Sequence, residues 1–253
     1  MNTVQHRVYR EKFDVKFYEA GISGTATMRA LCNYLQAAAN NHSRVLGTSM
    51  SDFSDQNMTW VYSRFHVRVD RYPACYENIS VETWRSQSSE AFAFREYRVY
   101  DEQDAVIVSG TARLVLIDVA SRKPVPIPAT ITEQFIPEKG RALEYDFPSI
   151  RKPREYAQKM DFRVRMSDID INNHANNSSY VDWITECVPP EVMTGRMLRS
   201  IELDYRAEIR YGEMITSASA HEEEGADAVF LHSLTSTGSD RPCTLARTTW
   251  ALQ

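Results

Sequence analysis

The two halves of this 253-residue chain repeat one pattern of apolar residues. Alternating apolar positions recur at an offset of 149: Phe13, Val15 and Phe17 align with Phe162, Val164 and Met166. A stripe with helical spacings of three and four follows at the same offset: Leu31, Tyr34, Leu35 and Ala38 align with Tyr180, Trp183, Ile184 and Cys187. Alternation predicts a half-buried strand, and the stripe predicts an amphipathic helix. We therefore expect two copies of one unit.

Later matches keep the same order along the chain. Alternation at Phe65, Val67 and Val69 returns at Leu203, Tyr205 and Ala207, an offset of 138, so loops are shorter in the second copy. The first helix is predicted to start near Thr25 and to end before Gly47. Further strands are predicted at 81–84, 91–100, 106–117, 215–220, 228–237 and 244–252. One long helix on an antiparallel sheet gives each unit an α+β fold.

Prolines mark the boundary between the copies. Six of the ten prolines lie between residues 124 and 153, and the run Lys-Pro-Val-Pro-Ile-Pro at 123–128 is incompatible with a helix or a central strand. A long extended connection is more typical between domains than inside one. We predict a first unit at 1–128, a linker at 129–158 and a second unit at 159–253.

Composition excludes several classes of protein. Hydrophobic residues make up 43% of the chain and charged residues 25%, as in globular proteins, and the formal charge of -5 argues against general nucleic-acid binding. The longest apolar runs are too short to span a membrane, and the first ten residues lack the apolar core of a signal peptide. The four cysteines are widely spaced without a C-x-x-C pair, which indicates reduced thiols in the cytoplasm.

The densest polar cluster lies at 166–177, between a predicted strand and a predicted helix. Asp170, Asn172 and His174 alternate, so in an extended segment they share one face. A carboxylate, an amide and an imidazole together can orient a water molecule, hold a carbonyl group and move protons. The spacing alone leaves a second explanation open, because Asn and Asp also cap helices.

The repeat helps to separate these two explanations. The first copy has Gly21, Ser23 and Thr25 where the second has Asp170, Asn172 and His174. If both copies share a fold, the polar triplet is not needed to build it, and we predict one active site per chain. The other amides of the cluster are better explained as helix-capping residues: Asn173, Asn176 and Asn177.

Specific motifs resemble one enzyme family. The segment 170–177 reads Asp-Ile-Asn-Asn-His-Ala-Asn-Asn and is followed by Tyr180, Trp183, Glu186 and Pro189. It is similar to the signature of acyl-acyl carrier protein thioesterases of plants and bacteria, and segments 35–42 and 59–73 also resemble that family. The similarity covers residues 9–252. It implies a tandem hotdog fold and hydrolysis of the thioester between a fatty acyl chain and the phosphopantetheine arm of acyl carrier protein.

The resemblance also implies catalytic roles. Asp170, Asn172 and His174 match the family motif, and Glu208 matches a glutamate placed in a strand at 203–209. Many plant members have a cysteine after that glutamate, but this chain has Ile209 there, so a nucleophilic cysteine at that position is excluded. We expect direct attack by water, with Glu208 as the base and Asn172 on the carbonyl.

Two details of that mechanism stay open. His174 would orient the water or protonate the thiolate, and Asp170 would hold either His174 or Asn172. Glu208, which lies between Arg206 and Arg210, is also explained as a cross-strand ion-pair partner.

The family tunnel for the acyl chain lies largely in the first unit. We assign five residues to its wall, although a place in the ordinary core explains each one as well: Met28, Leu31, Leu35, Met58 and Trp60. Acyl carrier protein is acidic, so a docking surface should be basic. The segment 151–165 has six basic and two acidic residues, and we assign docking to Arg151, Lys152 and Arg154, a solvated linker being the alternative.

The sequence contains no Walker loop, no G-x-G-x-x-G motif and no G-x-S-x-G nucleophile elbow. The other histidines lack the spacing of metal ligands, so we expect neither a metal nor an organic cofactor. Two alternatives to the carrier-protein thioesterase are a hotdog acyl-CoA thioesterase and a non-catalytic acyl-binding protein. Because a tandem hotdog already contains the pairing that single units reach by dimerising, a monomer or a homodimer is expected. The sequence does not set the preferred acyl chain length.

Overall fold

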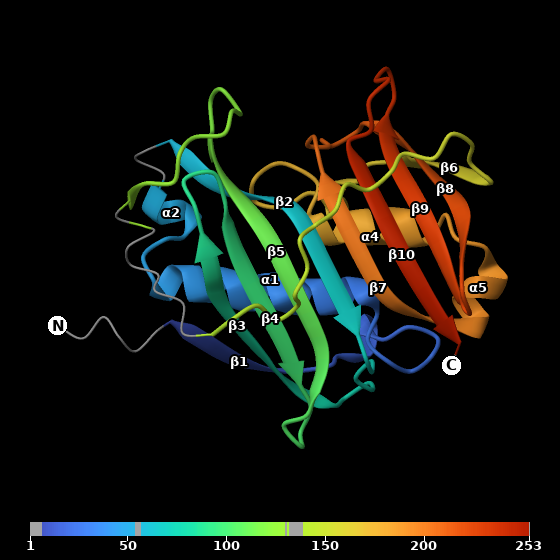
Figure 1. Ribbon diagram of the computed structural model, residues 1–253, viewed down its shortest axis with the longest axis horizontal. Coiled ribbons are helices and arrows are strands. Elements are labelled where there is room, and N and C mark those ends of the chain that lie inside the picture. The colour runs from blue at the N-terminus through green and yellow to red at the C-terminus, as the bar shows by residue number, and fades with distance from the viewer. Residues whose placement is uncertain (1–6, 54–56, 130, 132–138, 253) are drawn as a thin grey trace. The chain divides into compact units, whose positions relative to one another are not determined.

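The computed structural model describes residues 7–53, 57–129, 131 and 139–252. The chain forms two compact units, Met1–Asp146 and Phe147–Gln253 (Figure 1). Of the linker predicted at 129–158, residues 130 and 132–138 lie outside the described residues, and its bounds stay a prediction. Among the described residues, no helix has the length and apolar character needed to cross a bilayer.

Unit 1 packs one long helix, α1 (Met28–Val45), against an antiparallel sheet (Figure 1). Two short helices, η1 (Phe17–Glu19) and α2 (Met50–Phe53), flank α1 in the sequence. Helix α1 contacts strands β1 and β3. Over the described residues, the strand order is β1 (Val8–Asp14), β3 (Asn78–Ser88), β4 (Ala93–Tyr100), β5 (Val106–Asp118) and β2 (Met58–Val69).

Unit 2 repeats this arrangement. Helix α4 (Asn177–Thr185) contacts β8 and β9, with η3 (Met166–Asp168) before it and α5 (Pro190–Gly195) after it. Over the described residues, the strand order is β6 (Gln158–Arg163), β8 (Met214–Glu224), β9 (Asp227–Ser236), β10 (Thr244–Leu252) and β7 (Arg196–Tyr205). Each strand holds the place of its counterpart in unit 1. The predicted α+β tandem hotdog is therefore confirmed.

Helix α1 forms where its apolar stripe predicts it. Leu31 and Leu35 are fully buried, as the spacing requires. The Thr27 side chain caps the helix by accepting a hydrogen bond from the Ala30 N–H at 3.1 Å. The predicted start near Thr25 was too early because Thr25 forms a β-bridge with Ala74. The end before Gly47 is confirmed, since Val45 is the last helical residue.

Four residues predicted in the first strand of each copy lie outside β1 and β6: Val15, Phe17, Val164 and Met166. Strands β1 and β6 end at Asp14 and Arg163, so Phe17 and Met166 fall in η1 and η3 and are 75% and 65% exposed. The strands stop because the chain turns after Val15 and Val164, whose N–H groups donate to the carbonyls of Glu77 and Glu213. In both copies the apolar alternation therefore continues past the last residue of the strand.

Three of the four cysteines are buried, and Cys75 is half-buried. Cys187 follows α4, is fully buried and donates its thiol to the Ser217 carbonyl at 3.3 Å. All four cysteines are free thiols. The prediction of reduced thiols and of a core role for Cys187 is confirmed.

The extended segment after residue 139 is attached to the core of unit 1. Arg141 forms a buried ion pair with Glu96 at 2.8 Å, and the Ala142 N–H donates to the other Glu96 oxygen at 3.0 Å. Burial raises the pKa of Glu96, so these donors stabilise a carboxylate that water does not reach. The Trp84 indole also donates to the Gly140 carbonyl at 2.9 Å.

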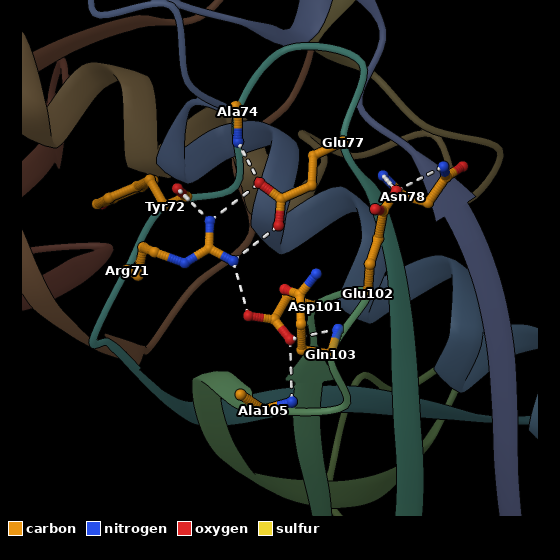
Figure 2. Close-up of polar contacts among 9 residues, drawn as sticks. All are labelled: Arg71, Tyr72, Ala74, Glu77, Asn78, Asp101, Glu102, Gln103 and Ala105. Carbon is orange, nitrogen blue, oxygen red and sulfur yellow. Dashed lines mark hydrogen bonds and ion pairs between the residues drawn. The ribbon is translucent and has the colours of Figure 1, made fainter.

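An ion-pair network joins two turns of unit 1 (Figure 2). The Arg71 guanidinium, in the turn between β2 and β3, donates to both Glu77 oxygens at 2.9 and 2.7 Å and to Asp101 at 2.9 Å. Asp101 lies in the turn between β4 and β5 and also accepts the N–H of Ala105. These donors lower the pKa values of both carboxyls: hydrogen bonds from Arg71 are the main cause at Glu77, and the Ala105 N–H is the main cause at Asp101.

We expect Arg71→Gln to lower the melting temperature by about 2–4 °C at pH 7. A carboxyl with a lowered folded-state pKa adds stability above its unfolded pKa, and that stability is lost as the pH falls through the folded value. The ordinary values are 4.5 for Glu77 and 3.8 for Asp101, so the difference from wild type should shrink steadily below about pH 4. Thermal melts from pH 7 to pH 3 test this, and an unchanging difference would contradict it.

Candidate active site

A short loop at 169–175 positions the predicted catalytic triplet. A β-bridge between Ile169 and Ala175 closes the loop. Inside it, the Asp170 N–H donates to the His174 carbonyl at 2.9 Å. The Ala175 N–H donates to the Ile209 carbonyl at 2.8 Å, which holds the loop beside the residue that follows Glu208. The main chain thus brings together two segments that are more than 30 residues apart.

His174 and Glu208 are in direct contact. The distance from His174 Nε2 to Glu208 Oε2 is 2.8 Å, and the two side chains are 18% and 33% exposed. Glu208 was predicted within a strand, but β7 ends at Tyr205. The strand ladder stops there because Arg206 and Ala207 both donate their N–H groups to the Cys243 carbonyl. Glu208 therefore lies in a loop and reaches His174, rather than a neighbour across a strand.

Asp170 contacts the other member of the triplet. Its Oδ1 accepts the Asn172 backbone N–H at 2.8 Å, and its Oδ2 lies 3.4 Å from the Asn172 side-chain nitrogen. Of the two partners predicted for Asp170, the structure places Asn172 on its carboxylate. The arrangement thus contains two polar pairs, Asp170 with Asn172 and His174 with Glu208.

The start of α4 is capped by Asn176. Its Oδ1 accepts the Ser178 N–H at 2.9 Å, and its carbonyl accepts the Ser179 N–H at 2.8 Å. The capping role predicted for Asn176 is confirmed. The cap also engages two of the first amides of the helix, so these are not positioned to bind a substrate oxygen in this structure. Asn173 instead adopts a left-handed conformation with φ of 62°.

Asp168, which the sequence pattern did not reveal, stabilises the turn directly before the loop. Its side chain is 1% exposed and accepts both Nε and Nη2 of Arg165, at 3.1 and 2.8 Å, together with the Arg165 N–H. The available signal was the repeat, since Glu19 stands at the equivalent position and accepts the Lys16 N–H.

Unit 1 contains the same loop without the same chemistry. The Gly21 N–H donates to the Thr25 carbonyl, and the Ala26 N–H donates to the Pro73 carbonyl, both at 2.9 Å, as their counterparts do in unit 2. Gly24 is left-handed with φ of 73°, like Asn173. The identical main-chain bonds show that the loop forms without a carboxylate, an amide or an imidazole.

The equivalence extends to the residue at the glutamate position. Because Pro73 plays the part of Ile209, Tyr72 stands where unit 2 has Glu208. In unit 1 the hydroxyls of Ser23 and Thr25 lie 2.8 Å apart and bond to each other. Of the two equivalent loops, the one in unit 2 therefore carries the acid–base groups.

The five residues assigned to an acyl tunnel fall into two groups. Met28, Leu31 and Leu35 are buried on α1. Met58 and Trp60 are partly buried against a cluster around Phe53. Trp60 also lines a cavity of about 10 Å³, room for about one water molecule. Its other lining residues are Arg85, Gln87, Ser88, Ala93, Ile127 and Ile131.

The three residues assigned to docking lie in the extended segment before β6. Arg151, Lys152 and Arg154 are all exposed. The Arg151 guanidinium forms an ion pair with Glu222. Exposure is what docking requires, but the assignment itself stays a prediction.

Comparison with known families matches both units. The family model described as Acyl-ACP thioesterase N-terminal domain matches residues 6–135. The model described as Acyl-ACP thioesterase C-terminal domain matches residues 151–252. The candidate site lies wholly within the second match.

Individual proteins support the same assignment. The chain is 29% identical over 238 residues to an oleoyl-acyl carrier protein thioesterase of Coriandrum sativum and 28% identical over 232 residues to one of Arabidopsis thaliana. These matches cover 87% and 85% of this chain but only 64% and 63% of the relatives. A 12:0-ACP thioesterase from Umbellularia californica has a TM-score of 0.88 at 26% identity, covering 97% of this chain and 94% of that chain.

Asn173, the left-handed residue of the loop at 169–175, allows a test of the loop's main-chain conformation. Asn173→Ala should lower the free energy of unfolding by about 1 kcal/mol, because alanine is strained at positive φ. Asn173→Gly should be as stable as wild type or more so, since unit 1 uses Gly24 at this position. Each variant removes the same exposed asparagine side chain, so the two variants differ mainly in how readily their backbone adopts a positive φ. Urea unfolding measures both, and equal stability of the two variants would contradict the assignment.

Proposed function

Because the chain belongs to the acyl-ACP thioesterase family, we propose that it hydrolyses the thioester of fatty acyl-acyl carrier protein and releases a free fatty acid. The observation that carries the proposal is the 2.8 Å contact between His174 Nε2 and Glu208 Oε2 in the unit that matches the C-terminal domain of the family. A carboxylate and an imidazole in contact, both partly exposed, can bind and activate water.

Glu208 is the proposed base. One of its oxygens contacts His174, and its side chain is 33% exposed, so water can reach the carboxylate. The water oxygen attacks the thioester carbonyl carbon while its proton passes to Glu208. The tetrahedral intermediate then breaks its carbon–sulfur bond, the departing thiolate takes a proton from His174, and the proton held by Glu208 passes to His174, which restores both groups. In this scheme His174 also orients Glu208, since its Nε2–H donates to the carboxylate.

Asn172 is the proposed partner of the substrate carbonyl. Asp170 accepts one side-chain N–H and the backbone N–H of Asn172, which fixes the direction of the amide. A primary amide has two N–H donors, so one remains for the developing oxyanion. Asp170 acts in this scheme through Asn172 and does not touch the substrate.

We place the acyl chain in unit 1, along the wall that contains Met58 and Trp60. The cavity beside Trp60 is too small for a fatty acyl chain, so binding requires neighbouring side chains to move. Met28, Leu31 and Leu35 are fully or nearly buried between α1 and the sheet and act as the rigid side of that wall. Two further predictions go with this function: a location in the cytoplasm, and a monomer or homodimer.

Two alternatives make different predictions for substrates. A hotdog acyl-CoA thioesterase would prefer acyl-CoA to acyl-carrier protein, and an acyl-binding protein would retain the chain without hydrolysis. Thiol release is measured for acyl chains from C8 to C18, and at each length the carrier-protein thioester is compared with the CoA thioester. This comparison separates the carrier-protein thioesterase, the acyl-CoA thioesterase and the acyl-binding protein. Fast hydrolysis of the carrier-protein substrates with slow hydrolysis of the CoA substrates is the expected result, and preference for CoA would overturn the proposal.

His174→Ala and Glu208→Gln should each lower kcat by about 10²–10⁴, the usual loss when a general acid or base is removed. Steady-state hydrolysis of the preferred acyl-carrier protein measures this. The repeat supplies matched controls, because Thr25→Ala and Tyr72→Phe change the equivalent positions of unit 1 and should leave kcat near wild type. If His174→Ala retains activity within a few-fold of wild type, the proposed site is wrong.

Trp60→Leu should extend the accepted acyl chain length, because it removes an indole from the wall of the cavity. The measurement is the ratio of kcat/KM values for long and short acyl-carrier proteins. Leu245→Ala serves as the comparison, since Leu245 is buried in a core cluster of unit 2, and its loss should destabilise the fold by about 2–5 kcal/mol without changing that ratio. An unchanged ratio in Trp60→Leu would remove this residue from the tunnel.

A further inference from the structure

Three arginines of unit 2 lie next to the segments that form the candidate active site. Arg206 and Arg210 stand two residues before and two residues after Glu208. Arg163 is the last residue of β6, next to the turn that leads into the catalytic loop. All three are exposed.

Contacts with β8 and with Tyr211 place Arg163 beside the segment that contains Arg210. Arg163 pairs with Met214 across β6 and β8, so their side chains lie on the same face. The Arg163 guanidinium also lies 5.6 Å from the centre of the Tyr211 ring, and Tyr211 follows Arg210 directly. Arg206 is held by Asp204, which accepts Nε and Nη2 at 2.9 and 2.8 Å.

Two of the arginines keep their charge available to a partner. Within the described part of the chain, no carboxylate lies within ion-pair distance of the guanidinium group of Arg163 or Arg210, although Glu213 accepts the Arg210 backbone N–H at 3.2 Å. The chain as a whole carries a net charge of -5, so a cationic surface beside the site is a local departure from its average. Such a surface steers an anionic partner toward the site.

Exposed apolar side chains lie among the arginines. Ile171 stands between Asp170 and Asn172 in the catalytic loop and is 90% exposed. Met166, Tyr211 and Met214 are 65%, 49% and 41% exposed. Apolar groups within a charged rim are typical of a protein–protein interface.

Unit 1 again serves as an internal control. Arg206 and Ala207 both donate to the Cys243 carbonyl, and Asp70 and Arg71 both donate to the Ile107 carbonyl, so Asp70 is the counterpart of Arg206. By the same criterion, Ala74 is the counterpart of Arg210, since the Glu77 and Glu213 N–H groups donate to their carbonyls.

The third counterpart follows from the strand ends. Asp14 ends β1 as Arg163 ends β6. The three positions therefore carry a formal charge of −2 in unit 1 and +3 in unit 2, on equivalent main-chain frames. Because unit 1 forms the same turns without them, the arginines are not needed to build the fold.

We infer that Arg163, Arg206 and Arg210, with the exposed apolar side chains around the loop, form the docking surface for the acidic acyl carrier protein. The inference rests on the proposed function. Arginine suits this partner because its planar guanidinium can bind a surface carboxylate through two hydrogen bonds. The surface surrounds the reacting groups, so a carrier bound there presents its thioester to His174 and Glu208.

Charge reversal tests the surface. Arg163→Glu combined with Arg210→Glu should raise KM for acyl-carrier protein by about tenfold or more and should flatten its salt dependence. Hydrolysis of an acyl-pantetheine, which has no carrier protein, should stay near wild type because neither arginine takes part in the chemistry. Lys12→Glu with Arg44→Glu reverses two exposed charges of unit 1 and is the matched control.

Three results would overturn the inference. The first is an unchanged KM in the Arg163 and Arg210 variant, and the second is an equal rise of KM in the control variant. The third is an equal loss of activity toward acyl-CoA, which would mean that the arginines bind the phosphate shared by both substrates rather than the protein. Direct binding of unacylated carrier protein to the wild type and to the variant separates docking from catalysis. If the wild type hydrolyses no thioester, the proposed function fails, whereas loss of carrier binding in the variant alone would still support the surface.

Discussion

The hydrogen bond from the Ala175 N–H to the Ile209 carbonyl fixes the geometry on which the candidate site depends. Strand pairing cannot hold Glu208 in place, because the β7 ladder ends at Tyr205. The bond ties the residue after Glu208 to the residue after His174, at the point where α4 begins. The 2.8 Å contact between the two side chains follows from a main-chain attachment that both units share.

The main chain builds the loop and the side chains supply the acid–base groups. This division explains how one chain contains two equivalent loops but one set of acid–base groups. The bridges and turns use only N–H and carbonyl groups, and each copy meets its need for a left-handed residue with Gly24 or Asn173. An acid in each copy, the half-buried Glu19 and the buried Asp168, holds the turn before the loop. The side chains at the remaining loop positions are then free to differ.

Periodicity predicted the parts of the fold that burial drives. Leu31 and Leu35 revealed α1 because a helix with one buried face must repeat its apolar residues. The same signal failed at Phe17 and Met166, where the strands had already ended. It also gave no sign that Glu208 meets His174, because a contact made through a loop between distant segments leaves no period in the sequence. Only the resemblance to a family assigned both residues to one site, and their direct contact was not predicted. The arginines around the loop were missed because their meaning depends on which residues are equivalent in the two units.

The unused loop of unit 1 has a consequence for how such a chain evolves. Its hydrogen bonds still start α1 and still attach it to the turn at Pro73, so the loop is retained for folding after its reactive groups are gone. A duplicated unit can therefore lose catalysis without losing stability. Its interior, where Arg85 and Arg95 are buried, can then change under selection without affecting the residues that carry out the reaction. Duplication in this architecture separates two pressures that a single unit must satisfy at once.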